Sequence, residues 1–277
     1  MSYSSFGTTL SILGFVVCMF TTDWNQFSLK EYWPHYLCSI CLLLLSIWFI
    51  CIRFIKHKRM NKGSKVIRSL QQRASKLEAQ LPNKNYEDCQ SKTIQMCSKI
   101  SEAFSIIKNT QISVCIKFIN TKDKLDYVET LARDYKSLDE RDDNDETNDA
   151  LNDNSDFKSI ISSHSNINTQ KRWSDIFYCQ NNLPHIYGYY NSHLDETKLS
   201  NGIFGIFARH FQWPLPYRST LIVPISNYND DSFYGFLCLD SKQIYSFNCE
   251  SDIEMLRSVV ISIWKITELT LSKIPKH

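Results

Sequence analysis

The residues best suited to bind a small molecule are polar or amphipathic groups at the ends of expected strands. The set is Arg133, Arg172, Tyr178, Asn181, Tyr217, Arg218 and Asp240. An arginine guanidinium can bind a phosphate or a carboxylate through two parallel hydrogen bonds. Because a ligand pocket holds only a few polar groups, a surface or loop-anchoring role stays open for each residue. We predict that the set contains a ligand site.

The acidic segment Asp139–Asp156 has a spacing that could be read as a cation site. Its alternating members are Asp143, Asp145, Thr147 and Asp149. An EF-hand loop, however, needs a glycine where Asn148 stands and a bidentate glutamate where Asn154 stands. We therefore expect a solvated loop without a metal ion.

Short catalytic motifs are missing from the sequence. It contains no H-E-x-x-H pair, no G-x-S-x-G elbow and no phosphate-binding G-x-x-x-x-G-K-[ST] loop. A catalytic group assembled from distant residues stays open, since such groups are recognised by geometry. We expect a protein that is not an enzyme.

The ten cysteines do not form a metal-binding pattern. Four lie in apolar segments, and the other six are Cys89, Cys97, Cys115, Cys179, Cys238 and Cys249. A structural zinc site would need paired C-x-x-C ligands, which these scattered residues do not supply. In a reducing cytosol we expect free thiols.

The elements that must position the candidate residues alternate between strands and helices. We expect strands over Ile112–Ile119, Leu125–Asp134, Ile176–Gln180, Ser219–Ser226 and Phe233–Asp240, and helices over Asn85–Ile107, Asp156–Ser162 and Ser251–Leu271. Ser251 and Glu254 have the spacing of a capping box. Gly235 indicates a bulge or close packing in its strand. This order predicts an α+β domain with an antiparallel sheet flanked by helices.

Residues 85–271 resemble a GAF domain. The pattern S-x-L-x-V-P-I within Tyr217–Ile225, followed by G-F-L-x-x-D within Tyr234–Ser241, is typical of the last strand pair in that family. The helix before the first strand and the closing amphipathic helix add to the likeness. The Asn-Lys-x-Phe-Asp-Glu run of cyclic-nucleotide-binding members and a bilin-attachment cysteine are absent. The resemblance implies ligand or partner sensing without naming the ligand.

In such a fold the ligand would lie between the sheet and the helices and loops on one face, near the candidate residues. The segment 187–213 is rich in aromatic residues, and Gly202–Gln212 could form a short helix with an apolar face. We expect either a lid packed over the sheet or a surface that binds a ligand or partner.

Two apolar stretches, Phe6–Thr22 and Trp33–Ile52, predict a transmembrane hairpin over residues 1–55. Nine Lys and Arg residues follow between Arg53 and Lys76, and no Asp or Glu occurs there. Positive charge marks the cytoplasmic side of a span. We therefore expect an inner or cell membrane protein with both termini in the cytoplasm and a cytosolic sensor domain over residues 85–277.

Residues 56–84 form a basic helical connector in this scheme. Its apolar positions, spaced three and four residues apart, are Ile67, Leu70, Ala74, Leu77 and Leu81. This heptad spacing predicts a short coiled coil and a homodimer. An amphipathic helix lying on the cytosolic domain or on anionic lipid is the alternative.

Together these features predict a membrane-anchored, ligand-sensing signalling protein without a catalytic output domain. Two alternatives stay open: a membrane effector of a bacterial defence system gated by its sensor domain, and a scaffold that docks a partner through the 187–213 aromatic residues. The expected partners are the lipid bilayer, a second copy of the chain, and a small-molecule or nucleotide ligand or a signalling protein. The net charge of +2 gives no general case for nucleic-acid binding. No cofactor is identified.

Overall fold

The computed structural model describes residues 29–138, 149–166, 171–186, 188–194 and 211–274. The predicted first span, Phe6–Thr22, lies outside these residues. The chain divides into two units, Met1–Lys58 and Arg59–His277, and each is described by itself.

The first unit contains the N-terminal part of helix α2 (Leu29–Gln80). Among the described residues, one helix is long and apolar enough to cross a membrane. Large apolar side chains project from it into the surroundings on every side, including Leu44, Trp48 and Phe54. Among the described residues this apolar stretch is not buried against protein, and an apolar environment would stabilise such a helix. This helix corresponds to the second predicted span.

In the second unit, the C-terminal part of α2 packs on its own domain. Ile67, Leu70 and Ala74 are buried in the main core, and η2 (Leu81–Asn83) adds the buried Leu81. The coiled-coil prediction is therefore not supported, because the same apolar stripe is used within the chain. The structure agrees with the alternative prediction, in which this part of α2 is an amphipathic helix that lies on the domain that follows it. The homodimer stays a prediction.

A five-stranded antiparallel sheet forms the centre of the second unit, with strand order β2-β1-β5-β4-β3. The strands are β1 (Ile112–Lys122), β2 (Leu125–Arg133), β3 (Tyr178–Gln180), β4 (Ser219–Ser226) and β5 (Phe233–Ser241). The α+β class and the antiparallel sheet are confirmed. The five expected strands are present, with β4 at the predicted bounds.

Two long helices cover one face of this sheet: α3 (Tyr86–Lys108) and α7 (Ser251–Leu271). Shorter elements are α4 (Tyr135–Leu138), η3 (Leu151–Asp153), α5 (Ser155–Ser165), η4 (Trp173–Asp175) and η5 (Leu183–His185). The capping-box prediction for α7 is wrong, because Ser251 is the first residue of the helix and the N-cap residue, Glu250, makes no side-chain cap hydrogen bond. The Asn248 Oδ1 accepts the N–H groups of Glu250 (3.0 Å) and Ser251 (3.1 Å).

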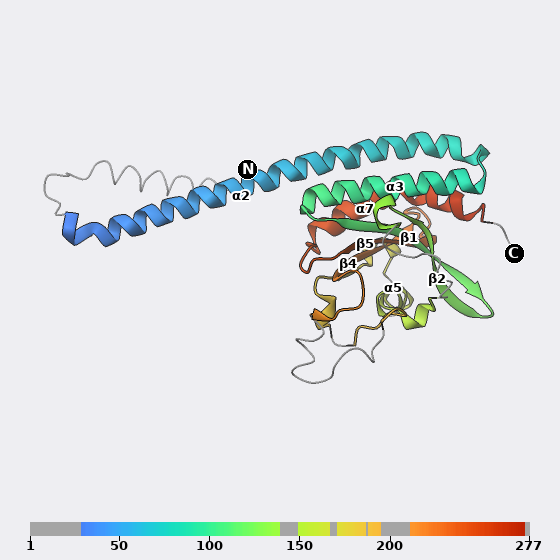
Figure 1. Ribbon diagram of the computed structural model, residues 1–277. Coiled ribbons are helices and arrows are strands. Elements are labelled where there is room, and N and C mark those ends of the chain that lie inside the picture. Colours follow the sequence, from blue (N-terminus) through green and yellow to red (C-terminus); the bar gives the residue numbers. More distant parts are fainter. Residues whose placement is uncertain (1–28, 139–148, 167–170, 187, 195–210, 275–277) are drawn as a thin grey trace. The chain divides into compact units, whose positions relative to one another are not determined.

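The two faces of the sheet pack against different helices (Figure 1). Strand residues such as Val114 and Leu239 join the core with α3 and α7. Their neighbours Cys115 and Cys238 point to the opposite face, where they join Phe157 of α5 in a second core. One face of the sheet therefore packs against α3 and α7, and the other face packs against α5 and the loops around it.

The structure pairs two of the six cysteines outside the apolar segments, all of which we expect from the sequence to be free thiols in a reducing cytosol. Cys179 of β3 and Cys249, just before α7, form a disulfide with a Cα–Cα distance of 5.9 Å. The pair is separated by 70 residues, so its proximity depends on the tertiary fold. Two hydrogen bonds also join the segment after β3 to the segment before α7. The Asn181 side chain binds the Phe247 backbone carbonyl and N–H, at 2.7 and 2.9 Å.

Candidate functional site

A cavity of ≈ 280 Å³ lies on the α5 face of the sheet. Its floor comes from β1, β2, β4 and β5, and its walls come from the segment around α5 and the loop before β4. The charged and titratable lining residues are Cys115, Lys117, Arg133, Asp149, Asp156, His193, Tyr217, Cys238 and Asp240. This concentration of charged groups in one cavity makes it a candidate ligand site in the described part of the chain.

Strand register explains how the floor is assembled. Arg133 of β2 lies directly opposite Cys115 of β1, and Cys115 lies opposite Cys238 of β5. Residues directly opposite each other project to the same face. The register therefore places a guanidinium and two thiols side by side across three strands.

Asp156 supplies a buried carboxylate to the wall. It lies in the first turn of α5 and is 3 % exposed. Its Oδ1 accepts the N–H of Phe157 at 2.9 Å, and the charges of Asp240 and Lys117 act on it with opposite sign. Burial, together with the nearby charge of Asp240, raises the pKa of this carboxyl to about 6. Such a group is poised to bind a hydrogen-bond donor.

Asp149 has a different environment in the same cavity. It accepts a hydrogen bond from Ser192 (2.5 Å) and lies near His193 Nε2 (3.0 Å) and Lys117 Nζ (3.6 Å). Burial alone would raise the pKa of Asp149, but these hydrogen bonds and the lysine charge outweigh burial and lower it. Asp149 is therefore an ionised group whose charge is balanced by protein partners. The prediction that its segment is solvated is wrong at this residue.

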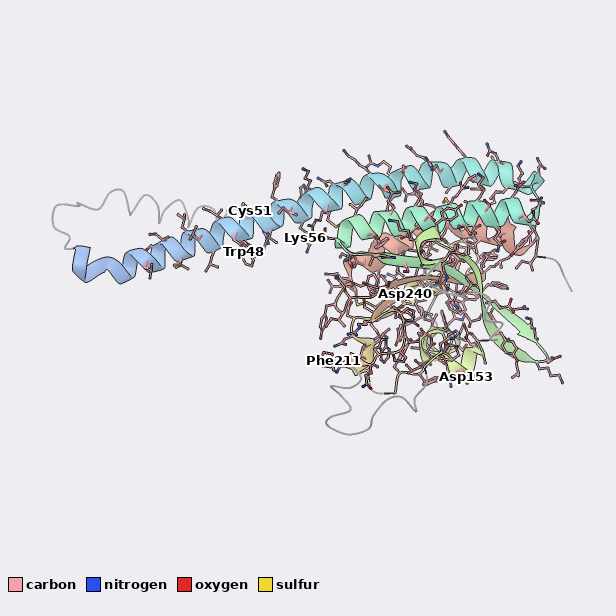
Figure 2. All side chains as sticks on the ribbon, in the orientation of Figure 1. Trp48, Cys51, Lys56, Asp153, Phe211 and Asp240 are labelled. Atoms are coloured by element: carbon pink, nitrogen blue, oxygen red, sulfur yellow. A yellow bond between two sulfur atoms is a disulfide. The ribbon has the colours of Figure 1, made fainter. Side chains whose placement is uncertain are left out.

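Arg133 and Asp240 lie at the floor, where both side chains are largely buried. The Asp240 Oδ1 accepts the hydroxyl of Thr220, its direct neighbour on β4, at 2.7 Å. Figure 2 shows the labelled Asp240 in the interior of its unit, whereas Phe211 lies at the edge. The cavity floor thus carries buried charges of both signs.

A small aromatic cluster borders the cavity. Tyr189 and Trp213 pack with Leu183, Leu194 and Leu215, and Leu215 also lines the cavity. The Trp213 indole N–H donates to the Tyr217 carbonyl at 2.7 Å. The flanking aromatic residues of the 187–213 segment therefore help to form a wall. Most of the predicted helix Gly202–Gln212 lies outside the described residues.

The structure brings three of the seven predicted ligand-binding residues to the cavity: Arg133, Tyr217 and Asp240. The other four do not line it. Arg172 binds the Tyr228 carbonyl and lies 3.9 Å from Asp231, and Asn181 holds the Phe247 backbone. Tyr178 is half-buried between two apolar clusters, and the Arg218 backbone pairs with Ser241. That any of the seven binds a ligand stays a prediction.

Sequence reasoning did not identify Lys117, Asp156, Cys115 or Cys238 as cavity residues. Strand alternation could have placed Cys115 and Lys117 on the face opposite Val114. Nothing in the sequence indicates that Asp156 is buried, because its burial depends on how α5 packs. The described residues contain no group of three or more His, Cys, Asp or Glu side chains suited to hold a metal ion.

No family model and no curated protein matches this chain. Among solved structures, it is similar to the GAF domain of an Acinetobacter phosphoenolpyruvate-protein phosphotransferase, with 9% identity over 78% of this chain and 98% of that chain and a TM-score of 0.42. It is similar to the type II free methionine-R-sulfoxide reductase of Thermoplasma acidophilum, with 11% identity, 68% and 95% coverage and a TM-score of 0.40.

A third similar structure is the free methionine-R-sulfoxide reductase of Neisseria meningitidis, with 8% identity, 73% and 89% coverage and a TM-score of 0.37. At these TM-scores, the similarities do not bear on what this chain binds or catalyses.

Proposed function

We propose that the chain is a membrane-anchored sensor whose second unit, Arg59–His277, is a GAF-like domain that binds a small polar ligand. The GAF-like assignment is supported by the sequence pattern of the last strand pair. It is also supported by the observed order of a helix, an antiparallel sheet and a closing helix. The membrane anchor is supported by the exposed apolar helix and the basic residues that follow it.

The single observation that carries the ligand-binding proposal is Asp156. A carboxylate is expensive to bury without partners, and proteins retain such groups mainly where they have a use. Asp156 is buried and lines the cavity, and its hydrogen bonds come from the backbone, with Phe157 N–H at 2.9 Å. A ligand amine or other donor would satisfy its second oxygen.

The cavity also indicates the size and charge of the ligand. At ≈ 280 Å³ it lies near the lower end of the roughly 300–1,000 Å³ range of small-molecule pockets. That volume favours a small metabolite over a nucleotide. The lining contains two basic side chains, Lys117 and Arg133, and two acidic ones, Asp156 and Asp240. An ampholyte with an amine and an anionic group is complementary to this mixture of charges.

Thermal unfolding of the full-length protein in detergent micelles tests this function. Amino acids, simple amines, carboxylic acids and nucleotides are added one class at a time. A ligand at a hundred times its Kd stabilises the folded state by about 2.7 kcal/mol, and the ampholytes should raise the Tm.

Asp156→Asn is the matched variant, since it keeps the side-chain shape and removes the charge. The ligand-dependent rise in Tm should be lost in this variant and retained in Asp153→Asn, which changes an exposed carboxylate outside the cavity lining. An equal rise in wild type and Asp156→Asn, or no rise with any class, contradicts the proposal.

A further inference from the structure

The two thiols on the cavity floor have no role in the proposed binding of an ampholyte. Cys115 and Cys238 are 2 % and 3 % exposed, belong to neighbouring antiparallel strands and are direct register partners. Both residues line the cavity. Neither is part of the Cys179–Cys249 disulfide.

The geometry of an antiparallel pair permits a bond between these thiols. Opposite residues have Cα atoms about 4.5 or 5.5 Å apart, depending on the type of pair. Disulfides form over Cα separations of about 4.4–6.8 Å. The backbone therefore needs no large movement to join Cys115 to Cys238.

Cys115 is also the better placed of the two to react. Arg133 is its direct neighbour on β2, and Lys117 lies two residues along β1 on the same face. Hydrogen bonding from Cys238 lowers the Cys115 pKa, and the positive charges of Arg133 and Lys117 lower it further, against the opposing effect of burial. A thiolate is the nucleophilic form of cysteine, so these neighbours favour attack by Cys115.

We propose that Cys115 and Cys238 form a redox-active dithiol that reduces a small hydroperoxide entering the cavity. The Cys115 thiolate attacks the terminal peroxide oxygen and the O–O bond breaks. The leaving alkoxide (hydroxide when the peroxide is hydrogen peroxide) takes up a proton from water and leaves as an alcohol (or water). Cys115 is then a sulfenic acid. The Cys238 thiol attacks that sulfur, the S–S bond forms and the S–O bond breaks. The departing hydroxide and the thiol proton leave as water.

This proposal shares the cavity of the proposed function but does not depend on a reversibly bound ligand. In a sensor, the new cross-strand bond would replace two thiols on the cavity floor and so change the surface that the ligand contacts. The oxidised and reduced forms would then differ in ligand affinity.

The test uses the full-length protein in detergent, reduced and then treated with one equivalent of hydrogen peroxide or cumene hydroperoxide. Non-reducing peptide mass spectrometry should find a linked pair of peptides that contain Cys115 and Cys238, with a mass loss of two hydrogens. Absence of that pair after the peroxide is consumed overturns the proposal, and this measurement requires no variant.

Single-cysteine variants then show which thiol attacks the peroxide and which attacks the sulfenic acid. In Cys238→Ser the reaction should stop at a Cys115 sulfenic acid that dimedone traps, and in Cys115→Ser peroxide consumption should fall at least about tenfold. Cys97→Ser is the control, because Cys97 lies in α3 within the core on the other face of the sheet. Equal consumption by wild type and Cys115→Ser overturns the proposal.

The ligand-binding proposal and the redox proposal are tested separately, because a rise in Tm on addition of ampholytes reports only on ligand binding. If Cys115→Ser still binds an ampholyte but the dithiol is inert, only the redox proposal fails. If the dithiol forms and no ampholyte binds, only the ligand proposal fails.

Discussion

Gly235 of β5 lies directly against the carbonyl oxygen of Lys117 on β1. A Cβ atom at Gly235 would approach that oxygen to 2.2 Å, and the residue has a φ of +148° that L side chains rarely adopt. The prediction of close packing at this glycine is confirmed. Glycine at this position lets the β5 backbone approach β1 beside Lys117, a lining residue of the cavity, so it helps to set the cavity floor.

Gly235→Ala should destabilise the second unit by about 2 kcal/mol or more, since it adds both a clash and backbone strain. At this domain size, each kcal/mol lowers the Tm by roughly 2–4 °C. Gly188→Ala is the control: its φ of +74° gives strain, but nothing lies within 4 Å of the added atom. Chemical denaturation of both variants measures the difference, and equal losses would contradict the role of the Lys117 contact.

The ion pair between Lys108 and Asp252 joins the end of α3 to the start of α7. The Asp252 side chain is 1% exposed and that of Lys108 is 14% exposed. Asp252→Asn leaves the lysine charge nearly buried without its partner and should cost about 3 kcal/mol. Glu102→Gln breaks the Lys99–Glu102 pair, whose side chains are 38% and 46% exposed, and should cost less than about 1 kcal/mol. Urea unfolding checks both values, and similar costs would show that burial of the pair is unimportant.

Asp156 predicts a specific pH dependence of stability. Its carboxyl has a pKa of about 6 in the folded state against 3.8 for the ordinary group. The unfolded chain therefore releases this proton first, and ionisation of Asp156 lowers the unfolding free energy as pH rises from about 4 to about 6. The difference between the two pKa values corresponds to about 3 kcal/mol above pH 6.

Asp156→Asn should therefore raise the unfolding free energy at pH 8 by up to about 3 kcal/mol and leave it unchanged near pH 3. Urea titrations at the two pH values measure the effect, with Asp153→Asn as the exposed control. A stabilisation that is equal at both pH values would show that the carboxylate charge is not its source. Stabilisation by removal of a polar group is typical of a site retained for function.

Local patterns in the sequence predicted the elements of the fold well. The apolar, β-branched run Ser219–Ser226 and the amphipathic run Ser251–Leu271 gave strand β4 and helix α7 at their observed bounds. The apolar spacing from Ile67 to Leu81 could not show whether this helix packs on its own chain or on a second copy. In both cases, the same apolar stripe is buried.

The site was predicted less completely because it depends on contacts between distant residues. Arg133 and Asp240 were predicted from their positions at strand ends. Asp149 and Asp156 were assigned to a solvated segment and to the start of a helix, and neither position reveals that the side chain is buried against the sheet. The Cys179–Cys249 bond likewise joins residues that no local pattern connects.

The disulfide and the basic residues of α2 favour different sides of the membrane. Disulfides are typical of oxidising compartments, whereas Lys and Arg beside a span mark the cytoplasm. We expect the basic residues to decide the orientation, because nine of them lie between Arg53 and Lys76, next to the apolar helix. The second unit should then be cytoplasmic, and the disulfide should be reduced there except under oxidising conditions.

Protease treatment of sealed membrane vesicles checks this orientation. Inside-out vesicles should expose residues 59–277 to digestion, and right-side-out vesicles should protect them. The double variant Leu44→Arg/Ile47→Arg should weaken insertion of this helix and lower the share of the chain in the membrane fraction, since each arginine near a helix centre costs about 2.5–3.5 kcal/mol in insertion. Arg68→Leu is a control outside the apolar stretch and should stay membrane-bound. Protection in inside-out vesicles would reverse the topology and place the disulfide in an oxidising compartment.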